Sequence, residues 1–166
     1  MNRAAVYAGS FDPITLGHLD VIQRVSPLFD KLYLLVARNS TKTSLFDATE
    51  RKALLEANLS GLLRKDSYEI EDYEGLTVNY CEEKNAKVLI RGIRALSDFE
   101  KEFQIATMNR HLNRSIESLH VMTDEKYFFV SSSLVKEIAA YGGPLSHLVP
   151  KNVEEALREK FRSRNA

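Results

Sequence analysis

The chain has 166 residues, a length that predicts one domain or a domain with a small appendage. Its 23 Lys and Arg residues balance 23 Asp and Glu residues, whereas a protein that coats nucleic acid would be more basic. Hydrophobic residues make up 44%, which argues against disorder, and no apolar run approaches the ~18 residues of a membrane span. The single cysteine, Cys81, excludes an internal disulfide, and the N-terminus has no signal-type apolar core. We therefore expect a cytoplasmic globular protein without a nucleic-acid or membrane partner.

The first half of the chain alternates between short apolar runs and helical periodicity. In chain order we expect a strand at 4–8, a helix at 17–26, a strand at 32–37, a helix at 47–59, a weak strand at 68–71 and a helix at 76–84. Pro27 limits the first helix. Asp47 with Glu50 three positions later resembles a capping box and predicts where the second helix begins.

The second half continues the alternation. We expect a strand at 87–90, a helix at 97–112, a strand at 119–122 and helices at 132–141 and about 152–162. Ser97 and Glu100 form another capping-box pattern, and Gly142 and Gly143 can end the helix expected at 132–141. The polar tail after 162 is expected to be frayed. Packing roles are the simplest interpretation of Tyr73, Tyr80 and Phe103.

Strands separated by helices of this length predict right-handed βαβ units and a mostly parallel sheet. We therefore expect an α/β, Rossmann-like, doubly wound five-stranded sheet with helices on both faces, as a single domain over residues 1–166. In such sheets ligands lie beyond the carboxyl ends of the strands, so the segments that follow the strands are the candidate site.

The loop after the first strand, residues 9–18, contains two glycines, a proline and hydroxyl groups. Glycine lets the backbone approach a ligand closely, and the start of the next helix offers free N–H groups to a phosphate. His18 lies in the first helical turn, where its ring can face the same anion. A plain turn with a capping histidine would explain the same residues, because the loop is neither a Walker A nor a GxGxxG motif.

Arg91 and Arg94 flank Gly92 directly after the strand expected at 87–90. The guanidinium group of arginine can donate two parallel hydrogen bonds to phosphate oxygens, and the end of a strand is the expected ligand position. Surface arginines paired with Glu100 or Glu102 are the plainer alternative.

Two more segments suit an anion. Lys42, in the polar segment 38–44, can act as a mobile point charge on phosphate, although a solvated loop has the same composition. The serines at 131–133 offer hydroxyls and backbone N–H groups at a helix start. The plainer alternative is that they only cap the helix, with more serines than one N-cap needs. Four anion-suited segments at one edge of one sheet favour a phosphate ligand.

These segments also resemble a known family. Residues 9–18 are similar to the TxGH form of the nucleotidylyltransferase superfamily motif, and residues 130–136, Val-Ser-Ser-Ser-Leu-Val-Lys, resemble its second signature. Arg-Gly-Ile-Arg at 91–94, with Asp-Phe-Glu at 98–100 and Met-Asn-Arg at 108–110, narrows the resemblance to the bacterial phosphopantetheine adenylyltransferases. It covers nearly the whole chain.

The resemblance implies adenylyl transfer from ATP to 4′-phosphopantetheine. The products would be 3′-dephospho-coenzyme A and pyrophosphate, in the penultimate and reversible step of coenzyme A biosynthesis. It further implies Mg²⁺, a homohexamer and feedback by coenzyme A. A phosphate monoester is already an anionic nucleophile, so alignment and charge stabilisation suffice without a general base. Few acidic residues occur in the four segments, so we expect no metal ligand from the protein and Mg²⁺ on the ATP phosphates.

The resemblance also implies roles for individual residues. The catalytic group would be His18, which would stabilise charge on the α-phosphate, with Ser10, Lys42 and Arg91. ATP would be bound by Ser10, Phe11, His18, Gly92, Ile93, Arg94, Glu102, Tyr127, Phe128, Phe129, Val130, Ser131, Ser132 and Ser133. Phosphopantetheine would be bound by Ser10, Lys42, Thr77, Arg91 and Asn109.

The chain departs from common members at a few positions. Lys101 stands where tyrosine is frequent, Phe128 where serine is usual, and Thr77 where leucine or methionine is often found. Two alternatives stay open. One is another nucleotidyl transfer of the superfamily, onto nicotinate mononucleotide or from CTP onto an alcohol phosphate. The other is a nucleotide-sensing or scaffolding module without turnover, which the presence of His18, Lys42 and Arg91 disfavours.

Overall fold

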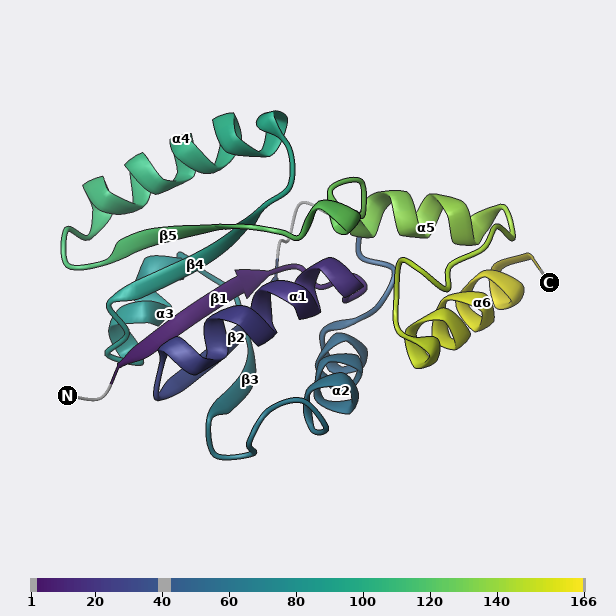
Figure 1. The fold of residues 1–166 in the computed structure, drawn as a ribbon, viewed down its shortest axis with the longest axis horizontal. Coiled ribbons are helices and arrows are strands. Elements are labelled where there is room, and N and C mark those ends of the chain that lie inside the picture. The colour runs from purple at the N-terminus through teal and green to yellow at the C-terminus, as the bar shows by residue number, and fades with distance from the viewer. Residues whose placement is uncertain (1–2, 39–42, 166) are drawn as a thin grey trace.

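The computed structural model describes residues 3–38 and 43–165 (Figure 1). Its strands are β1 (Ala4–Gly9), β2 (Lys31–Ala37), β3 (Tyr68–Tyr73), β4 (Val88–Ile93) and β5 (Glu117–Met122). They form one sheet in the order β3-β2-β1-β4-β5, and every neighbouring pair is parallel. The predicted doubly wound, five-stranded α/β fold is confirmed.

Helices follow the strands along the chain. They are α1 (Leu16–Val25), α2 (Ala48–Leu59), α3 (Thr77–Glu83), α4 (Leu96–Leu112), α5 (Ser132–Ala140) and α6 (Lys151–Asn165), with short 3₁₀ helices η1 (Ser26–Leu28) and η2 (Glu125–Tyr127). Within the described ranges, no helix combines the length and the apolar character needed to cross a membrane.

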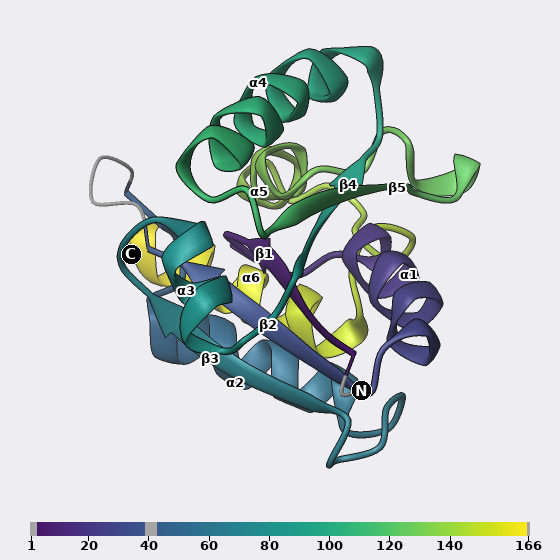
Figure 2. The same cartoon turned by 90° about the vertical axis from the view of Figure 1, so that its left-hand side faces the viewer.

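Alternation along β1 divides the core between the two faces of the sheet. Ala5 and Tyr7 belong to one buried cluster, which includes apolar side chains of α1, α2, α5 and α6. Val6 and Ala8 point to the other face and pack with side chains of α3. Figure 2 shows helices on both sides of the twisted sheet. The sheet therefore has both faces covered, as parallel sheets require.

The chain reverses its direction across the sheet after β3. From β1 it proceeds outward through β2 to β3, and then returns to the other side of β1 with β4 and β5. The carboxyl ends of β1 and β4 thus mark the switch point, where adjacent loops diverge and leave a crevice for a ligand.

Two capping boxes were expected, and the structure contains one of them. The capping box at Asp47 and Glu50 is confirmed, with both reciprocal hydrogen bonds at 2.9 Å. The one at Ser97 and Glu100 is wrong, because α4 begins at Leu96 and Ala95 occupies the N-cap position. The side chain of Asp98 instead accepts from the backbone N–H of Arg94 at 3.2 Å.

Two other segments extend beyond the expected bounds. β4 continues to Ile93, because Gly92 and Ile93 pair with residues of β5. Arg91 therefore lies in the strand and not in a loop after it. α6 starts at Lys151 and runs to Asn165, so the expected bounds 152–162 are corrected.

Candidate active site

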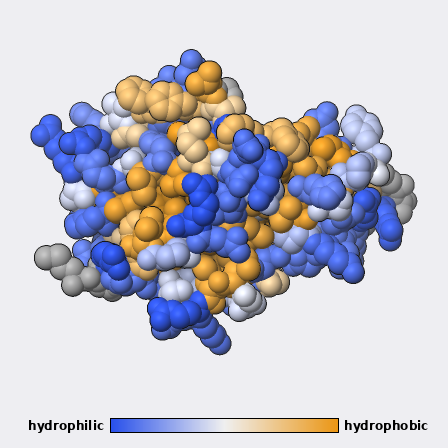
Figure 3. Space-filling view, in the orientation of Figure 1, coloured by the Kyte–Doolittle hydropathy of each residue, from blue (hydrophilic) through white to orange (hydrophobic). Residues whose placement is uncertain are grey.

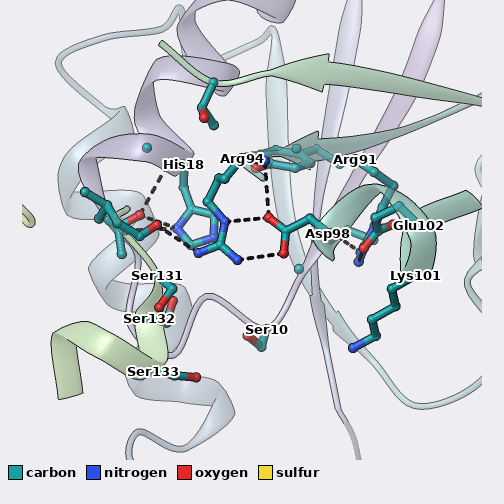
Figure 4. A pocket seen from close by; sticks show the side chains of 18 residues that line it. Ser10, His18, Arg91, Arg94, Asp98, Lys101, Glu102, Ser131, Ser132 and Ser133 are labelled. Atoms are coloured by element: carbon teal, nitrogen blue, oxygen red, sulfur yellow. Dashed lines mark hydrogen bonds and ion pairs between the residues drawn. The ribbon is translucent and has the colours of Figure 1, made fainter. Parts of the chain in front are cut away.

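A cavity of about 320 Å³ opens at the switch point, beyond the carboxyl ends of β1 and β4 (Figure 4). It is lined by Tyr7, Ala8, Gly9, Ser10, Thr15, Gly17, His18, Arg91, Gly92, Arg94, Asp98, Lys101, Glu102, Thr123, Val130, Ser131, Ser132 and Ser133. The end of β1, the first turn of α1, the end of β4, the start of α4 and the start of α5 therefore share one space.

His18 is held in a defined orientation by the N-terminus of its own helix. Thr15 occupies the N-cap, and its backbone N–H donates to Nδ1 of His18 at 3.0 Å. An imidazole nitrogen that accepts a hydrogen bond carries no proton, so the proton of the neutral ring is on Nε2. Burial, followed by the positive charges of Arg94 and Arg91, lowers the pKa of His18 to about 4. His18 is therefore a neutral hydrogen-bond donor at neutral pH.

The ring of Phe11 packs against His18. Its ring is fully buried and contacts the imidazole in an edge-to-face arrangement, with centroids 5.1 Å apart. Its backbone is in the left-handed region, at φ 46°. The ring lies against Gly9, where an added Cβ would approach it to 3.0 Å. Gly9 thus leaves room for the Phe11 ring that packs against His18.

Arg91 is bound tightly by its neighbours before any ligand arrives. Its Nε and NH2 groups donate to the two carboxylate oxygens of Glu102 at 2.8 and 2.7 Å, and NH1 donates to the carbonyl of Ala8 at 2.6 Å. The plainer alternative of an arginine paired with Glu102 is therefore correct for this contact. Two of the five N–H donors of Arg91 stay available to a ligand.

Arg94 joins two walls of the cavity. It forms a two-pronged ion pair with Asp98, at 3.0 and 3.1 Å, and donates to the carbonyl of Val130 at 2.9 Å. The end of β4 is thereby fixed to the segment that precedes α5. The fixed segment positions the serines at 131–133.

The three serines have different partners. Ser131 is the N-cap of α5, and its hydroxyl accepts from the backbone N–H of Leu134 at 3.0 Å. Ser132 donates to the carbonyl of Pro13 at 2.8 Å, which ties α5 to the loop after β1. Ser133 lines the cavity on the first turn of α5 and is exposed. The N-cap interpretation thus explains Ser131, while the helix start still offers backbone N–H groups to an anion.

Two buried charged residues, Arg51 and Asp12, support the loop after β1. Arg51, 5% exposed, donates to the carbonyls of Ser10 at 2.9 Å and Ala37 at 3.4 Å, and so joins α2 to two strand ends. Asp12 accepts from the backbone N–H groups of Leu45 and Phe46 and pairs with Lys136 of α5 at 2.6 Å. Neither contact has a local sequence signal, because each partner lies more than ten residues away.

Most of the predicted site residues lie together. Those that line the cavity are Ser10, His18, Arg91, Gly92, Arg94, Glu102, Val130, Ser131, Ser132 and Ser133. Those outside its lining are Phe11, Ile93, Thr77, Asn109, Tyr127, Phe128 and Phe129, whose ligand contacts stay predictions. Lys42 falls outside the described residues.

Some lining residues had not been assigned a ligand role. Tyr7 is buried, which raises the pKa of its phenol despite the opposing charges of Arg91 and Arg94, so it stays a protonated donor. Thr123 is also buried at the cavity edge. Lys101 reaches the cavity from α4. Tyr7 lies within the apolar run 4–8 and resembles a core residue, so the sequence pattern alone does not mark it as a site residue.

Comparison with known proteins shows the family of this chain. The cytidylyltransferase-like family matches residues 6–138. A phosphopantetheine adenylyltransferase from Carboxydothermus hydrogenoformans is 52% identical over 159 residues, which cover 96% of each chain. One from Staphylococcus carnosus is 47% identical over 95% of this chain and 96% of its own. This chain belongs to the phosphopantetheine adenylyltransferase family.

The fold is shared more widely than the phosphopantetheine adenylyltransferase sequence pattern. The nicotinic acid mononucleotide adenylyltransferase of Plasmodium falciparum, solved in complex with NaAD, superposes with a TM-score of 0.71 over 96% of each chain. Its sequence identity is 14%, so this likeness describes the fold alone. What distinguishes phosphopantetheine adenylyltransferases must therefore come from side chains within the common fold.

Proposed function

We propose that this chain transfers the adenylyl group of ATP to 4′-phosphopantetheine, giving 3′-dephospho-coenzyme A and pyrophosphate. The observation that carries the proposal is the cavity of this family member, in which the neutral donor His18 faces the same space as Arg91 and the N-terminus of α5. These groups suit a reaction between two phosphates, because each offers a hydrogen bond or positive charge to oxygen anions.

The main task of the protein in this reaction is to align the acceptor phosphate with the α-phosphorus of ATP; proton transfer is not needed. An oxygen of the acceptor phosphate attacks the α-phosphorus of ATP, and the bond to the bridging oxygen of pyrophosphate breaks. His18 donates from Nε2 to a non-bridging oxygen of the α-phosphate, where negative charge builds. The backbone N–H groups at the start of α5 hold the remaining ATP phosphates, and Arg91 holds the acceptor phosphate. The acceptor is already anionic, so no base is required.

Magnesium enters this proposal as part of the MgATP substrate. The carboxylates of the cavity, Asp98 and Glu102, are each engaged by an arginine. Oxygen ligands of Mg²⁺ would then come chiefly from the phosphates and water. Spectroscopy of the Mn²⁺ complex with and without Asp98→Asn would test this, since a direct carboxylate ligand would make the metal affinity fall in the variant.

The proposed assembly is a homohexamer, and the exposed apolar side chains of α4 and β5 support self-association. The large apolar side chains Leu96, Phe99, Phe103, Met108 and Leu112 of α4 are exposed, as are Leu119 and Met122 of β5. Phe103 is 61% exposed, so the expectation that it packs within the domain is wrong. Apolar side chains gather over α4 in Figure 3. Exposed large apolar side chains that gather on one part of a protein mark contact surfaces.

Coenzyme A is proposed as a feedback inhibitor, because it shares the pantetheine and adenylate parts of the product. Competition by coenzyme A against both substrates would support this, and the absence of inhibition at millimolar concentration would refute it. We further propose that the chain acts in the cytoplasm.

Pyrophosphate release from MgATP, measured with and without 4′-phosphopantetheine, tests the proposed function. Release should require the acceptor and fall by about 10²–10³-fold in His18→Ala. Nicotinate mononucleotide as acceptor and CTP as donor complete the panel. Turnover with either of these in place of the proposed pair would transfer the assignment to another branch of the superfamily. ATP binding without any release would indicate a nucleotide-sensing module.

A further inference from the structure

Lys101 brings a third cation to the cavity, from the second turn of α4. We propose that Lys101 binds the phosphate group of the acceptor, a phosphate monoester, and so contributes to acceptor affinity. This inference rests on the proposed function and deepens it.

The charges of the cavity set Lys101 apart from the two arginines. Each arginine forms a two-pronged ion pair, Arg91 with Glu102 and Arg94 with Asp98. Among the residues that the structure describes, no carboxylate oxygen lies within 4.0 Å of the Lys101 ammonium. The two arginine pairs are neutral overall, so Lys101 supplies the uncompensated positive charge of the described lining. A dianion that enters the cavity gains most from such a charge.

The position of Lys101 favours the acceptor over ATP. Lys101 precedes Glu102, whose carboxylate holds Arg91, the expected partner of the acceptor phosphate. His18 and the serines at 131–133, which are expected to meet the ATP phosphates, come from α1 and α5. Arg94 and Glu102, also expected to bind ATP, line the cavity together with Lys101, so the ATP arm of the test below decides between the two substrates. In Figure 4 the Lys101 side chain extends away from Glu102, toward the side of the view where Ser10 lies.

The chemistry of lysine suits this task. Its ammonium has three donors on a flexible stem, so it can follow a phosphate that changes position between substrate and product. Arg91 is fixed by three hydrogen bonds and cannot move with the phosphate. Arg91 and Lys101 would together provide one rigid and one mobile hydrogen-bond donor to the acceptor phosphate.

Steady-state kinetics of Lys101→Met and Lys101→Arg, with Lys151→Met as control, test the inference. Methionine keeps most of the stem but removes the charge, whereas Lys151 is an exposed lysine on α6. We expect Lys101→Met to raise the KM for phosphopantetheine about tenfold or more and to change the KM for ATP less than about twofold. Lys101→Arg should recover most of the loss, and Lys151→Met should behave as the wild type.

Calorimetric binding of phosphopantetheine and of pantetheine separates charge from packing. Loss of affinity for phosphopantetheine alone supports the inference. Equal loss for both ligands, a rise in the KM for ATP in place of the acceptor, or unchanged constants would each overturn it. If the constants of Lys101→Met are unchanged and the wild type is active, the inference about Lys101 fails but the proposed function stands. A wild type that does not use phosphopantetheine would remove both.

Discussion

The backbone N–H of Thr15 donates to Nδ1 of His18 over 3.0 Å, and this contact places the imidazole proton on Nε2. The same contact closes a capping box, because the backbone N–H of His18 points back to the Thr15 hydroxyl at 3.4 Å. One arrangement therefore begins α1 and orients the donor that the proposed reaction requires.

A pair of amide substitutions at position 18 tests the role of Nε2. The amide nitrogen of Gln can reach the position of Nε2, whereas that of Asn corresponds to Nδ1. We expect His18→Asn to lower kcat about 10²-fold or more and His18→Gln to lower it about tenfold less. Single-turnover rates at saturating substrates measure the difference. Equal rates for the two amides would contradict donation from Nε2.

The pH dependence of His18 follows from its surroundings. Its pKa in the folded protein, about 4, lies below the ordinary value of 6.5, because burial and the two arginines disfavour the imidazolium. The unfolded chain therefore binds more protons between these values, so His18 contributes stability above pH 6.5 that is lost as the pH falls toward 4. An NMR titration of the His18 ring, assigned with His18→Asn, should show a neutral imidazole down to about pH 5. A midpoint near 6.5 would refute the shift.

Glu102 is expected to act through Arg91. Glu102→Ala leaves the partly buried guanidinium without its counter-ion, which should lower the free energy of unfolding by about 2 kcal/mol, less than the ~3–5 kcal/mol of a fully buried pair. The KM for phosphopantetheine should rise as well, since Arg91 loses its fixed position. Urea denaturation and steady-state kinetics check the two effects. Glu100→Ala, at an exposed position on the same helix, is the matched control.

Arg51 is expected to stabilise the loop after β1. Arg51→Met removes the donors that satisfy the carbonyls of Ser10 and Ala37, and should cost about 2 kcal/mol of stability together with a loss of kcat. Arg64→Met, whose side chain is 79% exposed, should change stability by less than about 0.5 kcal/mol. Thermal denaturation of both variants provides the comparison. Similar effects at both positions would argue against the proposed support of the loop.

The exposed apolar side chains of α4 predict that a charge among them lowers the degree of assembly. Phe103→Glu places a charge beside Phe99, whose ring stacks on that of Phe103 at 6.2 Å between centroids. Light scattering after gel filtration should give a smaller particle for this variant than for the wild type. Leu28→Glu, an exposed apolar position on η1, should leave the particle size unchanged. A wild-type monomer would contradict the proposed hexamer.

Local sequence patterns determined much of the fold. The alternation of apolar runs and helical periodicity predicts the parallel sheet. The burial of a strand, or of one face of a helix, is visible in the spacing of apolar residues within that segment. The capping box at Asp47 and Glu50 is local for the same reason. Patterns of small and cationic residues after the strands also predicted Ser10, His18, Arg91 and Arg94 in one cavity.

Only the tertiary structure decided contacts that depend on distant partners. β4 extends through Arg91 to Ile93 because β5, some thirty residues later, supplies the pairing. Arg51 and Asp12 are buried because carbonyls, amides and a lysine from distant elements replace their hydration. The pairing of Arg91 with Glu102, and with it the distinct charge of Lys101, likewise arises where α4 packs beside β4. A sequence pattern describes residues that are close along the chain. The partners of these charged side chains come from other elements of the fold, so only the tertiary structure identifies them.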